Sequence, residues 1–272
     1  MSQSFSGRLV FIGAGNMAEA LVNGVLKSGV VSADRITVTD VLQERLDYLA
    51  GTYGVHGSTD NRVAVAGAEI VVLAVKPQIL QEVLAGLKPS LPGDALVVSI
   101  AAGIRAAAIE SGLQQGQRVV RVMPNTPCLV GRGVSAIAPG SHAKGNDVAT
   151  ARLLLEAVGV VVEVGEAELD AVTALSGSGP AYVFYFIEAM LAAGREFGLD
   201  DEKARLLVTG TFEGAARLVA ESGEDPAELR RRVTSKGGTT ERALGVFDES
   251  EVSGILHRAI RAAFERSKEL AD

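Results

Sequence analysis

Short β-branched and aliphatic runs alternate with helical patterns along the first half of the chain. Between the first four of these runs, apolar residues recur at helical spacing over residues 17–28, 41–53 and 78–87. Alternation of this kind predicts a doubly wound parallel sheet covered by helices, the Rossmann-type architecture that binds dinucleotides. The strands are predicted at residues 9–12, 36–39, 70–75, 95–100, 119–122, 134–138 and 160–164.

After about residue 166 the strand pattern stops and Ala-rich helical patterns take over. Pro180 suits the first turn of a helix over 181–197, which is apolar on nearly every side and is therefore expected to be buried. Further helices are predicted from a capping Asp200 or Asp201 to Gly223, from Asp225 and Pro226 with a back-reaching Glu228, over 240–247 and over 251–270.

The helical half is too small to cover the apolar helix 181–197 by itself. We therefore expect a homodimer built through the C-terminal helices. The predicted fold class is α/β, with a dinucleotide-binding Rossmann domain at residues 1–165. An all-α domain for substrate binding and dimerisation follows at 166–272.

Composition restricts the possible binding partners more than it restricts the possible folds. The chain has 272 residues and a net charge of -7, which disfavours nucleic acid and anionic membrane as partners. The basic cluster Arg230–Arg232 follows Glu228 and is expected to be a solvated helix face. We expect no signal peptide, and no apolar run approaches the roughly 20 residues of a membrane span. With a single cysteine, Cys128, these features suggest a soluble cytoplasmic protein.

A glycine-rich turn follows the first predicted strand and opens the first predicted helix. It reads Gly13-Ala14-Gly15-Asn16-Met17-Ala18. Gly13 permits a tight turn, Gly15 lets the backbone approach a pyrophosphate, and N-H groups at the helix start face the anion. A turn without a ligand is the other interpretation, but the flanking strand and helix favour dinucleotide binding.

Three further segments lie at predicted strand ends, where open α/β sheets bind ligands. Asp40 is placed to accept a hydrogen bond from a ribose hydroxyl of NAD, although it could equally cap the next helix. Arg45, one helical turn later, could still bind a phosphate. Lys76 could approach a ligand or be an ordinary solvated lysine. The small residues of 99–103 would allow either a nicotinamide ring or a helix to pack closely.

Blocks along nearly the full chain resemble the pyrroline-5-carboxylate reductase family. The strongest is PAELRRRVTSKGGTTERALGVFD at 226–248, which is similar to the C-terminal signature of that family. Supporting blocks are IGAGNMA from Ile12, LAVKP from Leu73, VVSIAAG from Val97, MPNTP from Met123 and LSGSGPAY from Leu175.

The resemblance implies reduction of 1-pyrroline-5-carboxylate to L-proline with NADPH or NADH, the last step of proline synthesis. It also implies subunits that interlock through the helical domain, with larger assemblies built from such dimers. The segment 237–240 matches the family's substrate loop. The positions that match its cofactor contacts are Ile12, Gly13, Ala14, Gly15, Asn16, Met17, Asn61, Ala74, Val75, Lys76, Pro77, Ala101, Ala102 and Gly103.

One departure concerns the cofactor. NADP-preferring relatives tend to carry serine or another small polar residue after the second strand, where this chain has Thr39-Asp40. We include both residues in the predicted cofactor site. The choice between NADPH and NADH stays open at this stage.

The reaction itself suggests roles within Ser235-Lys236-Gly237-Gly238-Thr239-Thr240. Backbone N-H groups of Gly237 and Gly238 are expected to hold the substrate carboxylate ahead of a helix. Thr240 is the predicted catalytic residue, orienting the imine nitrogen, while Thr239 supplies an N-H group and Ser235 steadies the loop. A helix-capping turn without a ligand is the alternative.

Other sites and functions were weighed against this one. Asn125 could contact a ligand or simply form a turn, Cys128 is expected to be packed, and the three histidines are expected at the surface, with no metal-ligand spacing. The alternative functions are a related imine reductase, a 3-hydroxyacid dehydrogenase, or a dinucleotide-binding regulator without turnover. The dehydrogenase usually needs a lysine or aspartate on the long helix, and 181–197 has neither.

Overall fold

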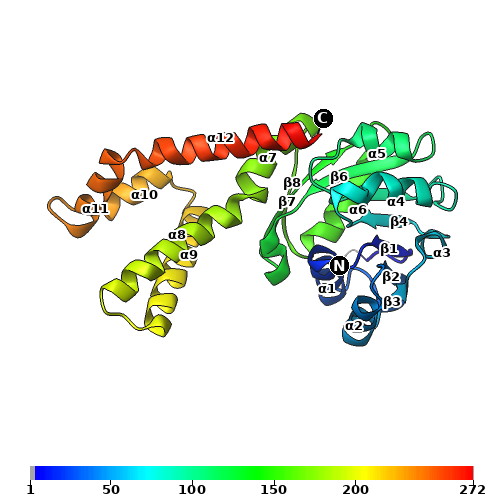
Figure 1. Ribbon diagram of the computed structural model, residues 1–272, viewed down its shortest axis with the longest axis horizontal. Helices are drawn as coiled ribbons and strands as arrows, with labels where there is room; N and C mark the ends of the chain where they lie inside the picture. The colour runs from blue at the N-terminus through cyan, green and yellow to red at the C-terminus, as the bar shows by residue number, and fades with distance from the viewer. Residues whose placement is uncertain (1–3, 272) are drawn as a thin grey trace. The chain divides into compact units, whose positions relative to one another are not determined.

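The computed structural model describes residues 4–271, apart from the side chain of Ala271, and its sheet has eight strands (Figure 1). Their spatial order is β3-β2-β1-β4-β5-β6-β7-β8, and all neighbours pair in parallel except β6 and β7, which are antiparallel. The predicted Rossmann-type sheet is therefore confirmed. The strands are β1 (Leu9–Ile12), β2 (Ile36–Thr39), β3 (His56–Ser58), β4 (Ile70–Leu73), β5 (Leu96–Ser99), β6 (Arg118–Met123), β7 (Gly133–Pro139) and β8 (Gly159–Glu163).

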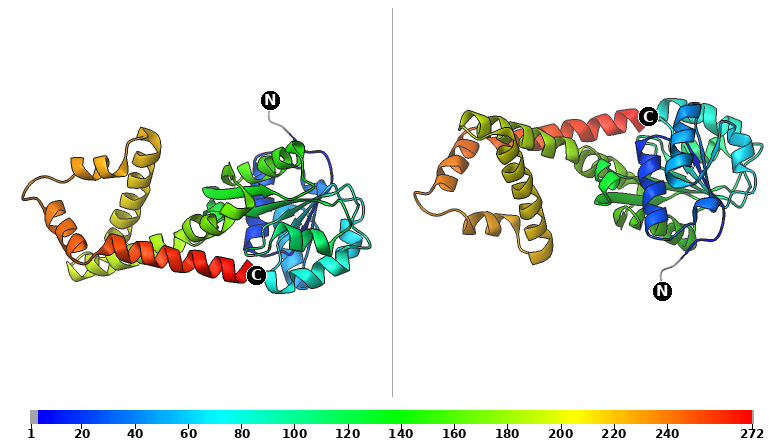
Figure 2. Two further views of the ribbon diagram at one scale, coloured as in Figure 1. Left: turned by 90° about the horizontal axis from the view of Figure 1, so that it is seen from above. Right: turned by 90° about the horizontal axis from the view of Figure 1, so that it is seen from below.

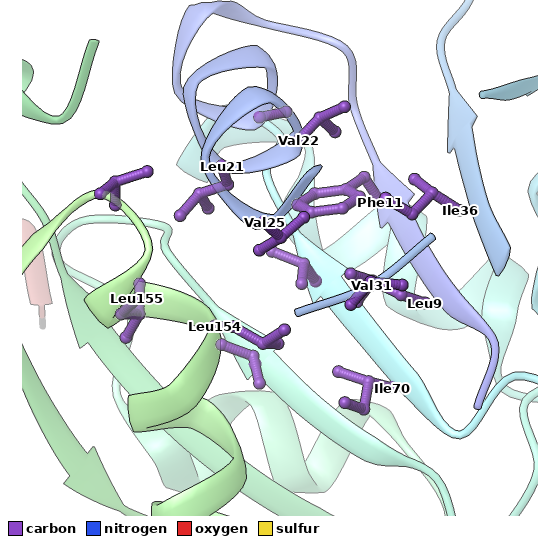
Figure 3. Packing of buried hydrophobic residues seen from close by; sticks show 14 of the residues in the cluster. Leu9, Phe11, Leu21, Val22, Val25, Val31, Ile36, Ile70, Leu154 and Leu155 are labelled. Atoms are coloured by element: carbon purple, nitrogen blue, oxygen red, sulfur yellow. The ribbon is translucent and has the colours of Figure 1, made fainter. Parts of the chain in front are cut away.

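Helices cover both faces of the sheet, and the strands β1, β4, β5 and β6 each contribute to two cores. Leu9 and Phe11 of β1 belong to one core (Figure 3), whereas Val10 and Ile12 belong to the other. Burial on both faces explains why these strands consist of continuous apolar runs. The first core takes residues from α1 (Asn16–Lys27), α2 (Gln43–Tyr53) and α6 (Gly145–Glu156), and the second from α3 (Asn61–Val65), α4 (Leu80–Leu87) and α5 (Ala106–Gly112).

Some predicted boundaries were wrong, and one strand was missed. The strand predicted at 70–75 ends at Leu73. β3 was not predicted because its residues His56, Gly57 and Ser58 carry no apolar pattern and are only partly covered. Strand identity there comes from pairing with β2, which local sequence does not encode.

The chain divides into two compact units. The first extends to Ser178 and also takes the C-terminal segment from Ala263, and the second is Gly179–Ala262. The predicted domain boundary at 165/166 stays a prediction. Figure 2 shows the helices of the second unit from two sides. The helices after the sheet are α7 (Leu169–Val172), a π-helical turn (Thr173–Gly177), α8 (Gly179–Glu196), α9 (Asp201–Ser222), α10 (Pro226–Arg232), α11 (Thr239–Glu249) and α12 (Val252–Ala271).

The apolar helix α8 is not buried within the chain, contrary to expectation. It packs on α9, where Gly194 lies against Ala204, but no residue of α8 is buried. Phe184 is 61% exposed and Tyr185 71% exposed. Among the residues that the structure describes, no helix is long and apolar enough to cross a membrane.

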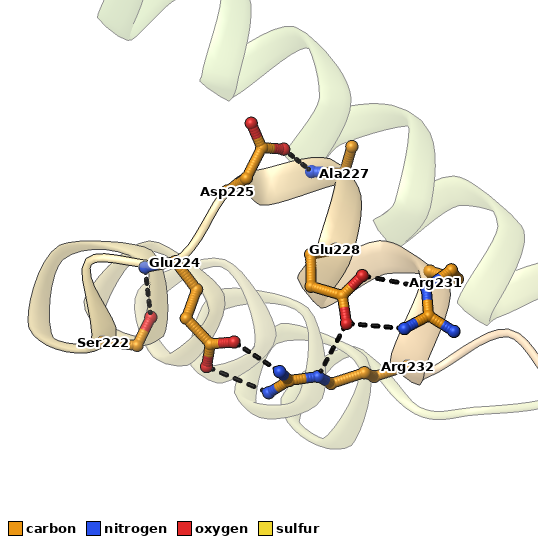
Figure 4. Close-up of polar contacts among 7 residues, drawn as sticks. All are labelled: Ser222, Glu224, Asp225, Ala227, Glu228, Arg231 and Arg232. Atoms are coloured by element: carbon orange, nitrogen blue, oxygen red, sulfur yellow. Dashed lines mark hydrogen bonds and ion pairs between the residues drawn. The ribbon is translucent and has the colours of Figure 1, made fainter.

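The junction between α9 and α10 is held by short polar contacts (Figure 4). At this junction, the carboxylate of Asp225 accepts the Ala227 N-H at 2.7 Å and so caps α10. Asp200 caps the opposite, N-terminal end of α9. Glu228 does not reach back to the cap as predicted, because it accepts hydrogen bonds from Arg231 and Arg232 instead. The basic cluster is exposed, as expected, and these ion pairs fix the end of α10, from which the loop to α11 starts.

Candidate functional site

The glycine-rich turn between β1 and α1 has the backbone that a pyrophosphate needs. Gly13 has φ +101°, and a Cβ there would lie 2.7 Å from the Ala74 carbonyl oxygen, so only glycine fits. A Cβ on Gly15 would meet nothing within 4 Å, so the space over it is open. No acceptor is found within the described chain for the N-H groups of Asn16 and Met17 at the start of α1. The turn therefore fits a dinucleotide phosphate.

The last residue of β2, Thr39, and the residue after it, Asp40, contact this turn in different ways. The Thr39 hydroxyl donates to the Phe11 carbonyl, and the Thr39 carbonyl accepts the Gly13 N-H at 2.9 Å, so Thr39 serves the turn from inside the fold. The Asp40 carboxylate accepts the N-H groups of Ala14 at 2.9 Å and Leu42 at 3.1 Å. Asp40 is thus fixed on the turn itself.

A polar cluster missed by sequence reasoning surrounds Arg45. Its Nε donates to the Ala14 carbonyl at 2.6 Å, and its Nη2 pairs with the Glu19 carboxylate. The hydroxyls of Tyr48 and Tyr53 donate to the same carboxylate at 3.1 and 2.9 Å. Burial would raise the pKa of Glu19, but these hydrogen bonds outweigh it and lower that pKa, so Glu19 is a carboxylate at neutral pH. Burial and Glu19 raise the pKa of Tyr53 to about 12.

A cavity of about 660 Å³ lies beside the loop after β2. Val41, Ile79 and Val83 give it apolar walls, and Asn61 lines it at the start of α3. Asn61 is a predicted cofactor position, and it follows β3 as the others follow their own strands. Polar and charged side chains make up much of the remaining lining, and the three apolar side chains offer a surface that suits a flat heterocycle such as adenine.

The remaining predicted cofactor positions follow β4 and β5. Lys76 is exposed and precedes the short 3-10 turn Pro77–Ile79, next to Ala74 and Val75. Ala101 and Gly103 are buried, and Ala102 is exposed. A Cβ on Gly103 would lie 3.3 Å from Leu270, so this glycine packs against the C-terminal helix, which was the structural alternative for this segment.

The loop before α11 uses its glycine N-H groups internally. Gly237 has φ +73°, and its N-H donates to the Glu241 carboxylate at 2.7 Å. The Gly238 N-H donates to the Ser235 carbonyl at 3.0 Å, and a Cβ on Gly238 would lie 2.5 Å from the Ser235 hydroxyl. Both N-H groups therefore have acceptors within the chain in this loop conformation, which does not favour their predicted role as carboxylate donors. That role, and the predicted role of Ser235 in steadying the loop, stay predictions.

Free donors lie one step further, in the first turn of α11. The helix has no side-chain cap, and no acceptor is found in the described chain for the N-H groups of Thr239 and Thr240. The Thr240 hydroxyl also has no partner there. Hydroxyls such as that of Thr234, at 2.7 Å, instead bind the carbonyl four residues earlier. Thr240 therefore offers an unengaged hydroxyl beside unengaged N-H groups.

A shallow hollow of about 380 Å³ adjoins this loop without including either threonine. It is lined by Gly237 and Gly238 and by Glu241, Arg242 and Glu249 of α11, among others. Two carboxylates against one guanidinium make it a poor site for an anion. We therefore assign no substrate role to the hollow itself.

Asn125 and Cys128 are structural residues. The Asn125 side chain accepts the Val134 N-H at 2.9 Å and donates to the Ser176 carbonyl at 3.2 Å, which ties the π-helical turn to the sheet. Cys128 is buried, as expected, and burial raises the pKa of its thiol.

Within residues 4–271, no group of three or more His, Cys, Asp or Glu side chains is arranged to hold a metal ion. The three histidines, His56, His142 and His257, are all exposed, as expected.

Two family models match the chain. One is described as "Pyrroline-5-carboxylate reductase dimerisation" and matches residues 166–270. The other, "NADP oxidoreductase coenzyme F420-dependent", matches residues 8–103, which include the glycine-rich turn. The matches cover the second unit and most of the nucleotide-binding half.

Relatives and solved structures agree with these matches. Pyrroline-5-carboxylate reductases of Methanosarcina acetivorans and Pseudomonas aeruginosa are 43% and 44% identical, each over 97% of this chain and 97% of the relative. The structure of a pyrroline-5-carboxylate reductase from Coxiella burnetii has a TM-score of 0.90 at 38% identity, over 98% of this chain and 99% of that one. A Plasmodium falciparum pyrroline carboxylate reductase with NADP bound has a TM-score of 0.89 at 29% identity, over 97% and 98%. This chain belongs to the pyrroline-5-carboxylate reductase family.

Proposed function

We infer that this chain reduces 1-pyrroline-5-carboxylate to L-proline with NAD(P)H, the last step of proline synthesis. The observation that carries this function is the identity of 43–44% with reductases of that name over 97% of both chains. The glycine-rich turn and the first turn of α11 supply the two kinds of donor that the reaction needs.

The substrate is a cyclic imine with a carboxylate, so it needs an anion site and a group at the imine nitrogen. The free N-H groups of Thr239 and Thr240 suit the carboxylate, because a helix N-terminus attracts anions. The Thr240 hydroxyl hydrogen-bonds the ring nitrogen. Gly238 keeps side-chain bulk away from this turn, and Ser235 with Gly237 holds its shape.

The chemistry requires little acid catalysis. The bound cofactor supplies a hydride to the imine carbon. The electron pair of the C=N bond moves to the nitrogen, and the charge of a protonated imine is thereby neutralised, which leaves the secondary amine of proline. The contribution of Thr240 is then to orient the nitrogen, rather than to act as a strong acid.

The cofactor is held by the carboxyl ends of β1, β2 and β4 and by the loop after β3. The N-H groups of Asn16 and Met17 suit the pyrophosphate, Asp40 suits a ribose hydroxyl, and Asn61 lines the cavity that suits adenine. Roles for Lys76 and for 101–103 stay predictions.

A homodimer is part of the same proposal. In a single chain, α8 and α12 leave an apolar groove of about 300 Å³ whose lining includes Tyr185, Phe186, Ile255 and Leu256. A second copy would cover apolar surface of this kind, and the match of 166–270 to a dimerisation family supports it. Assemblies larger than a dimer and a cytoplasmic location stay predictions.

The competing functions have no such support. On α8 the polar side chains are Tyr182, Tyr185, Glu188, Arg195 and Glu196, with no lysine or aspartate for a 3-hydroxyacid dehydrogenase. An assay with 1-pyrroline-5-carboxylate and either NADH or NADPH distinguishes the proposed reductase from a dinucleotide-binding regulator. We expect coenzyme oxidation and proline formation in a ratio of one to one. Coenzyme binding without oxidation would instead favour a regulator, and would contradict our inference.

A further inference from the structure

We propose that this chain binds NADH in preference to NADPH, because Asp40 places a fixed carboxylate on the glycine-rich turn and the nearby Arg45 is already paired. The inference deepens the proposed function and rests on its dinucleotide site. NADH and NADPH differ only in the 2'-phosphate of the adenosine ribose, so charge near that ribose decides between them.

Asp40 is held rigidly as an acceptor. Each of its two oxygens accepts one backbone N-H group: Oδ2 that of Ala14 at 2.9 Å, and Oδ1 that of Leu42 at 3.1 Å. A carboxylate can accept about four hydrogen bonds, so acceptor capacity remains for ribose hydroxyls. A phosphate monoester is also an acceptor and carries negative charge, so it gains no hydrogen bond here and is repelled.

Arg45 is the cation that could have offset this repulsion. Its Nε is used by the Ala14 carbonyl at 2.6 Å, and its Nη2 by the Glu19 carboxylate. Its guanidinium carbon also lies 5.1 Å from the centre of the Tyr48 ring. Two of the three guanidinium nitrogens of Arg45 are therefore engaged, and the side chain is held toward the glycine-rich turn and α1.

The partner of Arg45 is itself firmly ionised. Tyr48 and Tyr53 donate hydrogen bonds to Glu19, so this carboxylate keeps its charge and its hold on Arg45. Asp40, Glu19 and Arg45 together carry a net negative charge. The loop after β2 thus presents an acidic environment despite containing an arginine.

Arg62 is the other guanidinium in this region. It lines the cavity beside Val41, and its Nε donates to the Gly86 carbonyl at 3.2 Å. The carboxylates of Asp60 and Glu82 line the same cavity. Arg62 therefore does not make this pocket basic, and the balance of charge again disfavours a phosphate.

The test compares ADP-ribose with 2'-phospho-ADP-ribose by isothermal titration calorimetry on the intact protein. Neither probe can transfer a hydride, so the result does not depend on turnover. We expect ADP-ribose to bind at least about tenfold more tightly at low salt, and the difference to narrow as salt rises. Equal affinity, tighter binding of the 2'-phosphate probe, or no binding of either would overturn the proposal.

Matched variants locate the effect. Asp40→Asn removes the charge but keeps an oxygen for the Ala14 N-H, and we expect it to reduce the preference by about tenfold. Asp47→Asn removes the same charge from an exposed position on α2, where the Asp47 carboxylate accepts a hydrogen bond from the Gln43 amide, and should leave the ratio unchanged. An unchanged ratio in Asp40→Asn would overturn the assignment.

The two proposals can fail separately. Preference for ADP-ribose without any reduction of 1-pyrroline-5-carboxylate would reject the proposed function and keep this inference. Proline formation with a preference for the 2'-phosphate probe would do the reverse. If Asp40→Asn does not fold, the ratio in the unmodified protein decides by itself.

Discussion

In the unit that contains the sheet, Leu9 is buried on one face of the sheet and Val10 on the other, whereas α8 in the unit Gly179–Ala262 has no buried residue. The first unit has its own dense core, and the second leaves large apolar side chains exposed. The difference indicates that the nucleotide-binding unit is complete within one chain. The exposed apolar side chains of the helical unit form the surface that the proposed second copy would cover.

The largest expected effect comes from placing a charge in the apolar groove of the helical unit. Ile255 is 51% exposed in the single chain. If a partner covers it, Ile255→Glu buries two charges in a symmetric interface and should weaken the dimer about a thousandfold or more. Sedimentation velocity measures the change. Val63→Glu is the control, because Val63 is 67% exposed on α3 in the first unit. A dimer that persists in Ile255→Glu would contradict the proposal that a second copy covers this groove.

Thr240→Ala tests the catalytic part of the helical unit. Loss of one positioned hydroxyl should lower kcat by roughly ten- to a thousandfold. Coenzyme affinity should stay the same, because the dinucleotide residues belong to the other unit. Steady-state kinetics and coenzyme titration measure the two effects, and Thr240→Ser, which retains the hydroxyl, should recover most of the rate. Full activity in Thr240→Ala would refute the assignment.

Two truncations in apolar regions compare the units directly. Leu84 is fully buried in the first unit, and Leu84→Ala should cost about 3 kcal/mol of unfolding free energy. Phe186→Ala, in the groove, should instead show a cost that depends on protein concentration, because it acts through the dimer. Urea unfolding at two concentrations about a hundredfold apart separates these cases. The comparison fails if both variants respond alike.

The smallest expected effect concerns an ion pair in the first unit. Glu166 accepts the Ala106 N-H at 2.6 Å and pairs with the buried Arg121 at 2.7 Å. Burial would raise the pKa of Glu166, but these two contacts outweigh it and lower that pKa below its ordinary value of 4.5. The stabilisation is therefore present above pH 4.5 and is lost as the pH falls through the lowered pKa.

Glu166→Gln should remove that stabilisation. Since Glu166 is about a third exposed, we expect a loss of about 1–2 kcal/mol at neutral pH, less than for a fully buried pair. The difference from the unmodified protein should shrink as the pH is lowered below about 4.5. Unfolding free energies measured across this range check the prediction, and a difference independent of pH would contradict it.

Much of the sheet was predictable because its strands are buried on both faces and are therefore continuously apolar. β3 was not, since His56–Ser58 owes its strand identity to pairing with β2. At the site, the glycine-rich turn follows from local sequence, whereas the assignment of Thr240 rests on the family signature and stays a prediction. The pairing of Arg45 with Glu19 does not, because tertiary packing brings together residues 26 positions apart.

The hydrogen bond from the Gly237 N-H to the Glu241 carboxylate could have been predicted from the local sequence. A glutamate three residues after the N-cap Gly238 is the pattern of a side chain that reaches back over a helix start. That pattern would have moved the predicted carboxylate donors from the glycines to Thr239 and Thr240.

The proposed function depends on hydride transfer to the imine carbon of 1-pyrroline-5-carboxylate. Reduction with coenzyme that carries deuterium at its transferable position tests it most directly, with the product analysed by mass spectrometry and NMR. We expect proline with one deuterium on the ring carbon that adjoins nitrogen and does not bear the carboxylate. Coenzyme oxidation that leaves this carbon unlabelled, or no proline at all, would contradict it.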